Sequence, residues 1–180
     1  TDRIAKPDFR AGGVDNFWQD ATNTHGVWRQ TTLASYRSPA PAWDVVLDID
    51  KLAKDEGRNW FWKGATCLKP DQTRCLVRLS NGGGDAVELR EFDTVSKTFV
   101  EGGFRSPEGK QDAEWIDGDT LVAWREWTPG EVTASGYANV VKILKRSGEA
   151  TEIFRGQKSD VWANASVLRG EGGKAEGVLV

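Results

Sequence analysis

Few side chains in this chain could carry covalent or acid–base chemistry. His25 is the only histidine, and it lies in the turn-like stretch 23–26. Ser135 precedes a glycine but lacks the glycine two positions before it that a nucleophile elbow requires. A serine nucleophile also needs a base and an orienting acid within hydrogen-bond reach. We therefore predict no catalytic residue here and interpret His25 as a solvated turn residue.

Cys67 and Cys75 are the only cysteines, and they flank the turn at 69–73. If two paired strands flank this turn, the cysteines lie nearly opposite each other, where Cβ separations of about 4.5–5.5 Å approach disulfide reach. We predict a hairpin disulfide, with two reduced, buried thiols as the alternative. A disulfide would indicate an oxidising compartment, the periplasm or the outside of the cell. The spacing matches no zinc motif, so no metal is expected.

No pair of carboxylates stands out as a candidate catalytic or metal site. Three pairs could act as acid–base groups or calcium ligands, but each falls in a turn or at a strand end, where acidic residues serve solubility and capping. The pairs are Asp48 with Asp50, Asp117 with Asp119, and Glu149 with Glu152. No helical pattern follows the glycines at 82–84, so we interpret them as a hairpin turn rather than a phosphate-binding loop. No cofactor is predicted.

The elements that must position these residues are mainly strands. Runs of β-favouring residues alternate with clusters of Gly, Asn, Asp and Pro, and only 50–56 has a helical pattern. Twenty glycines and nine tryptophans in 180 residues agree with tight turns between aromatic-rich strands. The predicted strands are 15–20, 26–36, 43–48, 60–68, 74–80, 86–92, 98–100, 113–116, 121–126, 140–145, 152–154, 162–168 and 176–180.

The strand pattern repeats. Trp18, Trp62, Trp115 and Trp162 fall in the opening strands of successive units, at intervals of 44, 53 and 47 residues. Four strands per unit of this length is typical of a β-propeller. We predict an all-β fold, a partial β-propeller of about three and a half four-stranded antiparallel blades. Blade 1 is expected at about 14–48, blade 2 at about 60–100, blade 3 at about 112–154, and the start of blade 4 at about 161–180.

The repeated tryptophans are interpreted as packing residues between blades, with an exposed platform for sugars or peptides as the alternative. Closed propellers have about four to eight blades, so we expect an incomplete circle with a truncated first blade. The sequence contains no methionine, and we interpret it as a processed form or an excised piece. Open blade edges would favour pairing with the missing blades or with a second copy of the chain.

Charge and hydropathy argue against two classes of partner. The 24 basic and 27 acidic residues are interspersed and give a net charge of −3, so no basic surface for nucleic acid is indicated. No stretch approaches the roughly 20 apolar residues that span a bilayer. We expect neither a nucleic-acid nor a membrane partner.

Several motifs occur in a recognisable order. They are NFWQD at 16–20, GVWRQTT at 26–32, LKPD at 68–71, LSNGGGD at 79–85 and AEW at 113–115. This order resembles the N-terminal propeller of the prolyl oligopeptidase family of serine peptidases, over nearly the whole chain. The resemblance implies a propeller that covers the Ser-Asp-His site of an α/β-hydrolase domain, admits short proline-containing peptides and excludes folded proteins.

The resemblance also implies which residues face substrate. In the family, the propeller surface facing the hydrolase domain contributes to the substrate pocket, and the loop entering the third blade lies there. Here that loop is about 110–112, so Lys110 and Asp112 are the expected substrate-facing residues. The aromatic side chain that some members have in this loop is absent. No catalytic residue can be carried over, because the chain contains no hydrolase domain.

Two functions follow from these observations. The first is the gating propeller of a prolyl oligopeptidase-like peptidase, inactive alone, with the catalytic domain and short peptides as its partners. The alternative is a standalone propeller-like module that binds glycans or peptides through exposed tryptophans.

Overall fold

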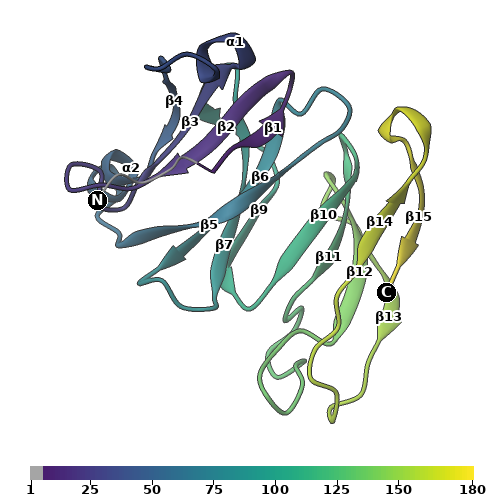
Figure 1. Cartoon of the computed structure of the whole chain (residues 1–180). Helices are drawn as coiled ribbons and strands as arrows, with labels where there is room; N and C mark the ends of the chain where they lie inside the picture. Colours follow the sequence, from purple (N-terminus) through teal and green to yellow (C-terminus); the bar gives the residue numbers. More distant parts are fainter. Residues whose placement is uncertain (1–5) are drawn as a thin grey trace.

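The structure is a computed structural model that describes residues 6–180 as a succession of antiparallel β-sheets (Figure 1). The first sheet contains β1 (Asp8–Arg10), β2 (Gly13–Trp18), β3 (Val27–Thr32) and β4 (Asp44–Asp48). The second contains β5 (Trp60–Cys67), β6 (Arg74–Asn81), β7 (Val87–Asp93), β8 (Thr98–Phe99) and β9 (Arg105–Gly109). The third contains β10 (Asp112–Asp117), β11 (Thr120–Trp124), β12 (Val140–Lys145) and β13 (Ala150–Arg155). A final pair contains β14 (Ser166–Arg169) and β15 (Ala175–Leu179).

The sheets confirm the predicted all-β propeller architecture, with two strands that the sequence did not reveal. β1 pairs with β2, so the first sheet has four strands and the expectation of a truncated first unit was wrong. β9 pairs with β7 beside the short β8, and these two strands share one edge of β7. The two strands missed by the sequence prediction are β1 and β9. Both are poor in β-branched residues, which explains why the propensity pattern did not indicate them.

Two short helices interrupt the first sheet and its connection to the second. α1 (Leu33–Tyr36) begins where Thr32 accepts a hydrogen bond from the Ser35 amide, so the predicted strand 26–36 ends early. α2 (Ile49–Glu56) confirms the helix expected at 50–56. The Asp48 carboxylate caps its first turn, and Gly57 ends it with φ 61°, a left-handed conformation that glycine adopts without strain. A 3₁₀ turn, η1 (Glu171–Gly173), joins β14 to β15.

The core lies between neighbouring sheets, because both faces of the central strands are buried. On β6, Cys75, Val77 and Leu79 face the first sheet, whereas Leu76 faces the third. β11 repeats the pattern, with Leu121 towards the second sheet and Val122 towards β14. This alternation is the two-residue period of a strand, and it makes each sheet depend on its neighbours for burial.

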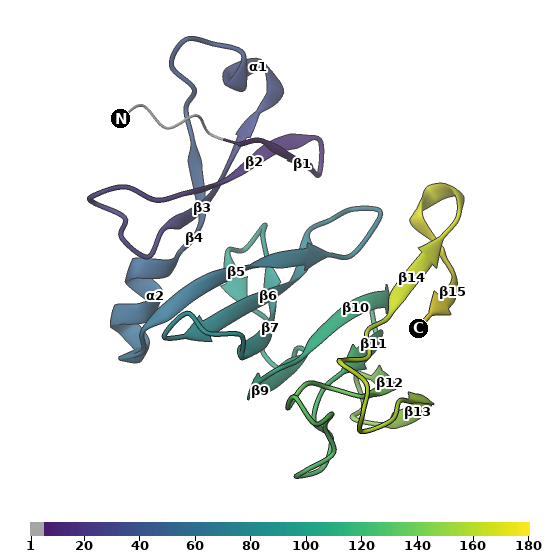
Figure 2. The same cartoon turned by 60° about the horizontal axis from the view of Figure 1, so that its bottom comes forward.

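The first strands of the second sheet, the third sheet and the final pair lie side by side. β10 contacts both β5 and β14, and the sheets fan outwards from these strands (Figures 1 and 2). At the C-terminal side of the fan, every residue of β13 is exposed. Among the described residues, no helix is both long enough and apolar enough to cross a membrane.

Candidate functional site

A cleft opens where β10 begins, and the two residues expected to face substrate both line it. Its volume is about 300 Å³. The lining residues are Asp85, Lys110, Gln111, Asp112, Trp124, Tyr137, Ala138, Trp162, Ala163 and Asn164. Asp112 begins β10 and Trp124 ends β11, and the others lie in the loops after β6, β9, β11 and β13. The cleft therefore joins the second sheet, the third sheet and the segment leading to β14. We call this the β10 cleft.

Gln111 anchors the two-residue loop between β9 and β10. The Gln111 amide group donates to the Val87 carbonyl at 2.7 Å, and its oxygen accepts from Ser106 Oγ at 2.6 Å. Beside it, Asp112 Oδ1 accepts from Arg78 Nε at 2.6 Å. These contacts tie the loop to the second sheet, so Lys110 projects from a fixed backbone rather than a free loop.

Lys110 forms one side of a three-residue bridge across the cleft. Its Nζ lies 3.9 Å from the ring centroid of Tyr137, a cation–π contact. The Tyr137 hydroxyl donates to Asp85 Oδ2 at 2.8 Å, so a residue of the third sheet's long loop reaches the turn between β6 and β7. The hydrogen bond to Asp85 and the charge of that carboxylate raise the pKa of Tyr137, which keeps the phenol protonated.

Trp124 and Trp162 supply the aromatic part of the β10 cleft. Trp162 is 59% exposed and lies outside any strand, whereas the sequence placed it in a strand at 162–168. β14 starts only at Ser166, because the backbone before it is fixed differently, with the Ala163 amide donating to the Ala138 carbonyl at 2.8 Å. Within residues 6–180, Trp162 is therefore not buried between sheets.

The other three repeated tryptophans also differ from one another in their surroundings. Trp62 packs against the core between the first two sheets, where it stacks on Phe17, and Trp115 is fully buried between the second and third sheets. Trp18 ends β2, the second strand of its sheet rather than an opening strand, and lies under Arg29. Packing between sheets is thus confirmed for Trp62 and Trp115.

The residues considered as nucleophile and base have other partners. Ser135 Oγ donates to the Val161 carbonyl at 3.0 Å, in the long loop between β11 and β12. His25 is half-buried rather than solvated, and its Nδ1 lies 2.6 Å from the Trp60 carbonyl oxygen. Within residues 6–180, no hydrogen bond joins these two side chains and no group of three or more His, Cys, Asp or Glu could hold a metal ion.

The carboxylate pairs serve local structure. Asp48 caps α2, and Asp50 accepts from the amides of His25 and Gly26. Burial raises the pKa of Asp50, but these hydrogen bonds outweigh it and hold that pKa below its usual value. The other two pairs end or flank turns, where their members bond to turn amides or to neighbouring Lys and Arg side chains.

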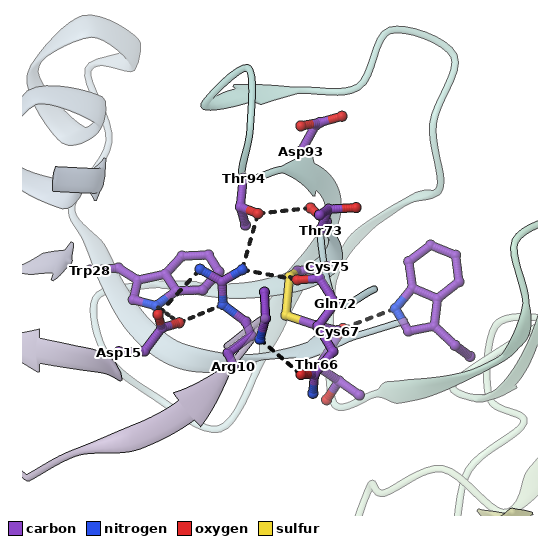
Figure 3. Close-up of a disulfide and its surroundings, with 12 residues drawn as sticks. Arg10, Asp15, Trp28, Thr66, Cys67, Gln72, Thr73, Cys75, Asp93 and Thr94 are labelled. Atoms are coloured by element: carbon purple, nitrogen blue, oxygen red, sulfur yellow. Dashed lines mark hydrogen bonds and ion pairs between the residues drawn. A yellow bond between two sulfur atoms is a disulfide. The ribbon is translucent and has the colours of Figure 1, made fainter. Parts of the chain in front are cut away.

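Cys67 and Cys75 occupy directly opposite positions on β5 and β6 (Figure 3). Their Cα atoms are 3.9 Å apart and the sulfurs are joined. The turn that this disulfide closes contacts the first sheet through Gln72. Arg10 donates to the Gln72 carbonyl at 2.9 Å, and the Ala11 amide donates to the Gln72 side chain at 3.0 Å.

Around Arg10, a buried cluster joins the first and second sheets (Figure 3). Arg10 Nε donates to Asp15 at 2.5 Å, and its Nη1 donates to Thr94 Oγ1 at 3.1 Å. The Trp28 indole N–H donates to the same Asp15 carboxylate at 3.0 Å. We call Arg10, Asp15, Trp28, Gln72 and Thr94 the Arg10 cluster; it fixes one sheet against the next.

The family resemblance singled out Lys110 and Asp112, which line the β10 cleft, but nothing in the sequence singled out Asp85 and Tyr137. These two are separated by 52 residues and meet only through turns. Each stood in a predicted loop with no periodic signal. The sequence did contain one indication, since both loops immediately flank predicted strands of neighbouring units, whose ends must lie together in a propeller.

The chain matches known proteins over most of its length. The model of the prolyl oligopeptidase N-terminal β-propeller domain matches residues 1–174. An uncharacterized peptidase of Sinorhizobium fredii, y4nA, is 54% identical over 97% of this chain and 24% of its own length. An uncharacterized peptidase of Rickettsia prowazekii, RP174, is 36% identical over 82% of this chain and 21% of its own length. The chain therefore spans about a quarter of the curated relatives that it matches.

A solved structure gives the same result in three dimensions. A post-proline cleaving enzyme from Rickettsia typhi superposes with a TM-score of 0.86 at 33% identity, over 93% of this chain and 26% of that one. Oligopeptidase B from Leishmania major shares the fold at 10% identity, with a TM-score of 0.65 over 92% of this chain and 22% of that one. The sheets, the motif order and these matches agree: the chain belongs to the family of prolyl oligopeptidase N-terminal β-propeller domains.

Proposed function

We propose that this chain is the part of a gating propeller that contacts short, proline-containing peptides on their way to an α/β-hydrolase active site. The observation that carries the proposal is the β10 cleft. It combines a cation, two carboxylates and two indole rings at the ends of strands from neighbouring sheets. A peptide offers amides, charges and apolar side chains together, and such a mixed surface suits it.

The name of the Rickettsia typhi enzyme supports the choice of substrate. That protein is a post-proline cleaving enzyme, and it is similar to this chain at 33% identity. Exposed indole rings bind proline rings well, because the apolar C–H groups of proline pack against the face of the indole ring. Trp162 has the exposure that this contact requires.

The C-terminal side of the fan supports a role within a larger assembly. β13 is exposed on both faces, and apolar side chains remain uncovered near it. They are Ile153, Phe154, Val161, Leu168 and Leu179, each at least 39% exposed. Further blades of the longer protein would cover this surface. A second copy of the chain is the competing occupant, and sedimentation that shows only monomer at high concentration would remove it.

Peptide hydrolysis by the full-length gene product tests the proposal. Internally quenched peptides of increasing length, each with Pro or Ala at one position, separate proline specificity from length selection. We expect hydrolysis of short proline peptides, little hydrolysis of the alanine versions, and none of a folded protein substrate.

Two results would contradict the proposal. Equal hydrolysis of folded and short substrates would remove gating. No peptidase activity, together with tryptophan fluorescence quenching by oligosaccharides, would instead support a glycan-binding module. Trp162→Ala distinguishes the two, because it should abolish that quenching if the indole ring is the sugar platform.

A further inference from the structure

Lys110 is a cation without a carboxylate partner in a cleft where the other charges are engaged. Asp112 pairs with Arg78 at 2.6 Å, and Asp85 accepts the Tyr137 hydroxyl at 2.8 Å. Lys110 contacts the Tyr137 ring, and it forms no ion pair with any carboxylate of residues 6–180. A half-buried ammonium group with only a π contact retains three hydrogen-bond donors for a ligand.

The β10 cleft also holds free hydrogen-bond donors, beside the carboxylate oxygens of Asp85 and Asp112 and the amide oxygen of Asn164. The indole N–H groups of Trp124 and Trp162 and the amide group of Asn164 have no hydrogen-bond partner within the described part of the chain, and all three residues line the cleft. Gln111 is already saturated by contacts to Val87 and Ser106. The cleft therefore offers a cation and several N–H donors, which is the chemistry that a carboxylate requires.

We propose that the β10 cleft binds a carboxylate of the peptide, with Lys110 as its counter-ion and Trp162 beside the neighbouring residue. This rests on the proposed peptide-binding function and deepens it. The carboxylate can belong to the C-terminus of the peptide or to an acidic side chain, since both present the same two oxygens.

The cleft's own carboxylates do not prevent this binding. Arg78 neutralises Asp112 and also donates to Thr66, so that pair turns towards the second sheet. Asp85 contacts the hydroxyl edge of Tyr137, whereas Lys110 lies over the face of the ring. The hydrogen bond to Asp85 makes the ring more electron-rich, which holds the ammonium group in place for an incoming anion.

The test uses the full-length protein and two pairs of proline peptides. The first pair differs only in a C-terminal carboxylate or carboxamide. In the second pair both peptides are amidated, and one carries Glu where the other carries Gln. We expect kcat/KM to be roughly three- to ten-fold higher for the charged member of at least one pair, mainly through KM, and this preference to fall with added salt.

Lys110→Met should bring the ratio of kcat/KM between charged and neutral peptides close to one, and Lys110→Arg should retain the preference. Lys54→Met, on exposed α2 and away from the cleft, is the matched control and should behave as wild type. Equal kcat/KM within both pairs, or an equal loss on charged and neutral peptides in Lys110→Met, would overturn the inference.

A binding measurement separates failure of the carboxylate site from failure of the proposed peptidase function. Proline-free versions of the same pairs are titrated calorimetrically, so carboxylate binding is measured even if no peptide is cleaved. Binding of the charged member that is lost in Lys110→Met supports the carboxylate site independently of hydrolysis. Equal binding of both members refutes it.

Discussion

The Arg10 cluster and the β10 cleft use the same kinds of side chain, a cation with carboxylates and indole rings, for different ends. In the Arg10 cluster, Arg10 and Asp15 are each at most 6% exposed, and their polar atoms meet protein partners. In the β10 cleft, Lys110 meets only a ring face, and Trp162 stays 59% exposed. Saturated, buried polar groups stabilise a junction, whereas exposed and unpaired ones remain available to a ligand.

The largest effect is expected from Arg10→Met, which tests the stabilising side of this comparison. The substitution keeps an unbranched apolar stem but removes the guanidinium group, which leaves the Asp15 carboxylate buried without its cation. We expect the free energy of opening of the first sheet to fall by about 3–5 kcal/mol, measured by native-state hydrogen exchange of the full-length protein.

A surface pair supplies the control for this change. Lys97 and Asp44 also link the first two sheets, but they are 39% and 72% exposed. Lys97→Met should cost less than about 1 kcal/mol. A loss below 1 kcal/mol for Arg10→Met would show that the cluster does not hold the junction.

The next effect is expected from the disulfide that closes the turn touching Arg10. Thiol labelling of the denatured protein, followed by mass measurement, should add two labels only after reduction. Because the closed loop is short, replacing both Cys67 and Cys75 with Ser should cost about 2–3 kcal/mol. The double variant's thermal unfolding should then be insensitive to reductant. Labelling without reductant would instead favour the two buried thiols.

The alternation of strands and turns was enough to predict the architecture from the sequence. The residues at 74–80 were predicted as a strand because apolar residues dominate them between two turn-forming segments, and β6 lies there. β1 and β9 were not predictable in this way, since their pairing depends on neighbouring strands rather than on their own composition. α1 was missed because the capping hydroxyl of Thr32 competes with strand extension.

The candidate site was predictable only in part. Lys110 and Asp112 were located through the family resemblance, and the structure brings both to one cleft. Trp162 was assigned to packing because its spacing matched that of Trp62 and Trp115. The spacing of the tryptophans predicted the length of the repeat, but it could not show that Trp162 is exposed here, because burial depends on what covers a residue.

Glu91 gives a smaller effect, at the end of the second and third sheets away from the β10 cleft. Burial raises the pKa of this carboxyl, but hydrogen bonds from Arg146, the Phe104 amide and Arg74 outweigh it and lower that pKa below its usual 4.5. Because the pKa is lowered in the folded state, the ionised carboxylate stabilises the fold at pH values above its usual pKa of 4.5. This stabilisation is lost as the pH falls from about 4.5 towards the folded-state pKa.

Glu91→Gln should therefore lower stability at neutral pH by roughly 1–2 kcal/mol and flatten its decline between pH 4.5 and the lower folded-state pKa. Thermal unfolding across this pH range measures both changes. Glu149→Gln, which removes an exposed i,i+4 pair, should change neither. An unchanged slope in Glu91→Gln would mean that other carboxylates dominate the acid response.

Trp162→Ala is expected to have the smallest effect on stability, and it tests the binding side of the comparison. The ring is largely exposed and donates no hydrogen bond within residues 6–180, so we expect the free energy of unfolding to change by less than about 0.5 kcal/mol. KM for short peptides should nevertheless rise several-fold, because an indole ring contributes most where a ligand covers it. Peptide kinetics and thermal unfolding of the same preparation measure both quantities.

Val95→Ala is the matched control, since Val95 is 74% exposed in the turn after β7 and lies outside the β10 cleft. It should leave both KM and stability unchanged. A loss of stability above 1 kcal/mol in Trp162→Ala, with KM unchanged, would place Trp162 with the packing residues. The β10 cleft would then differ from the Arg10 cluster in exposure alone, and its unpaired donors would no longer distinguish a binding surface from an uncovered junction.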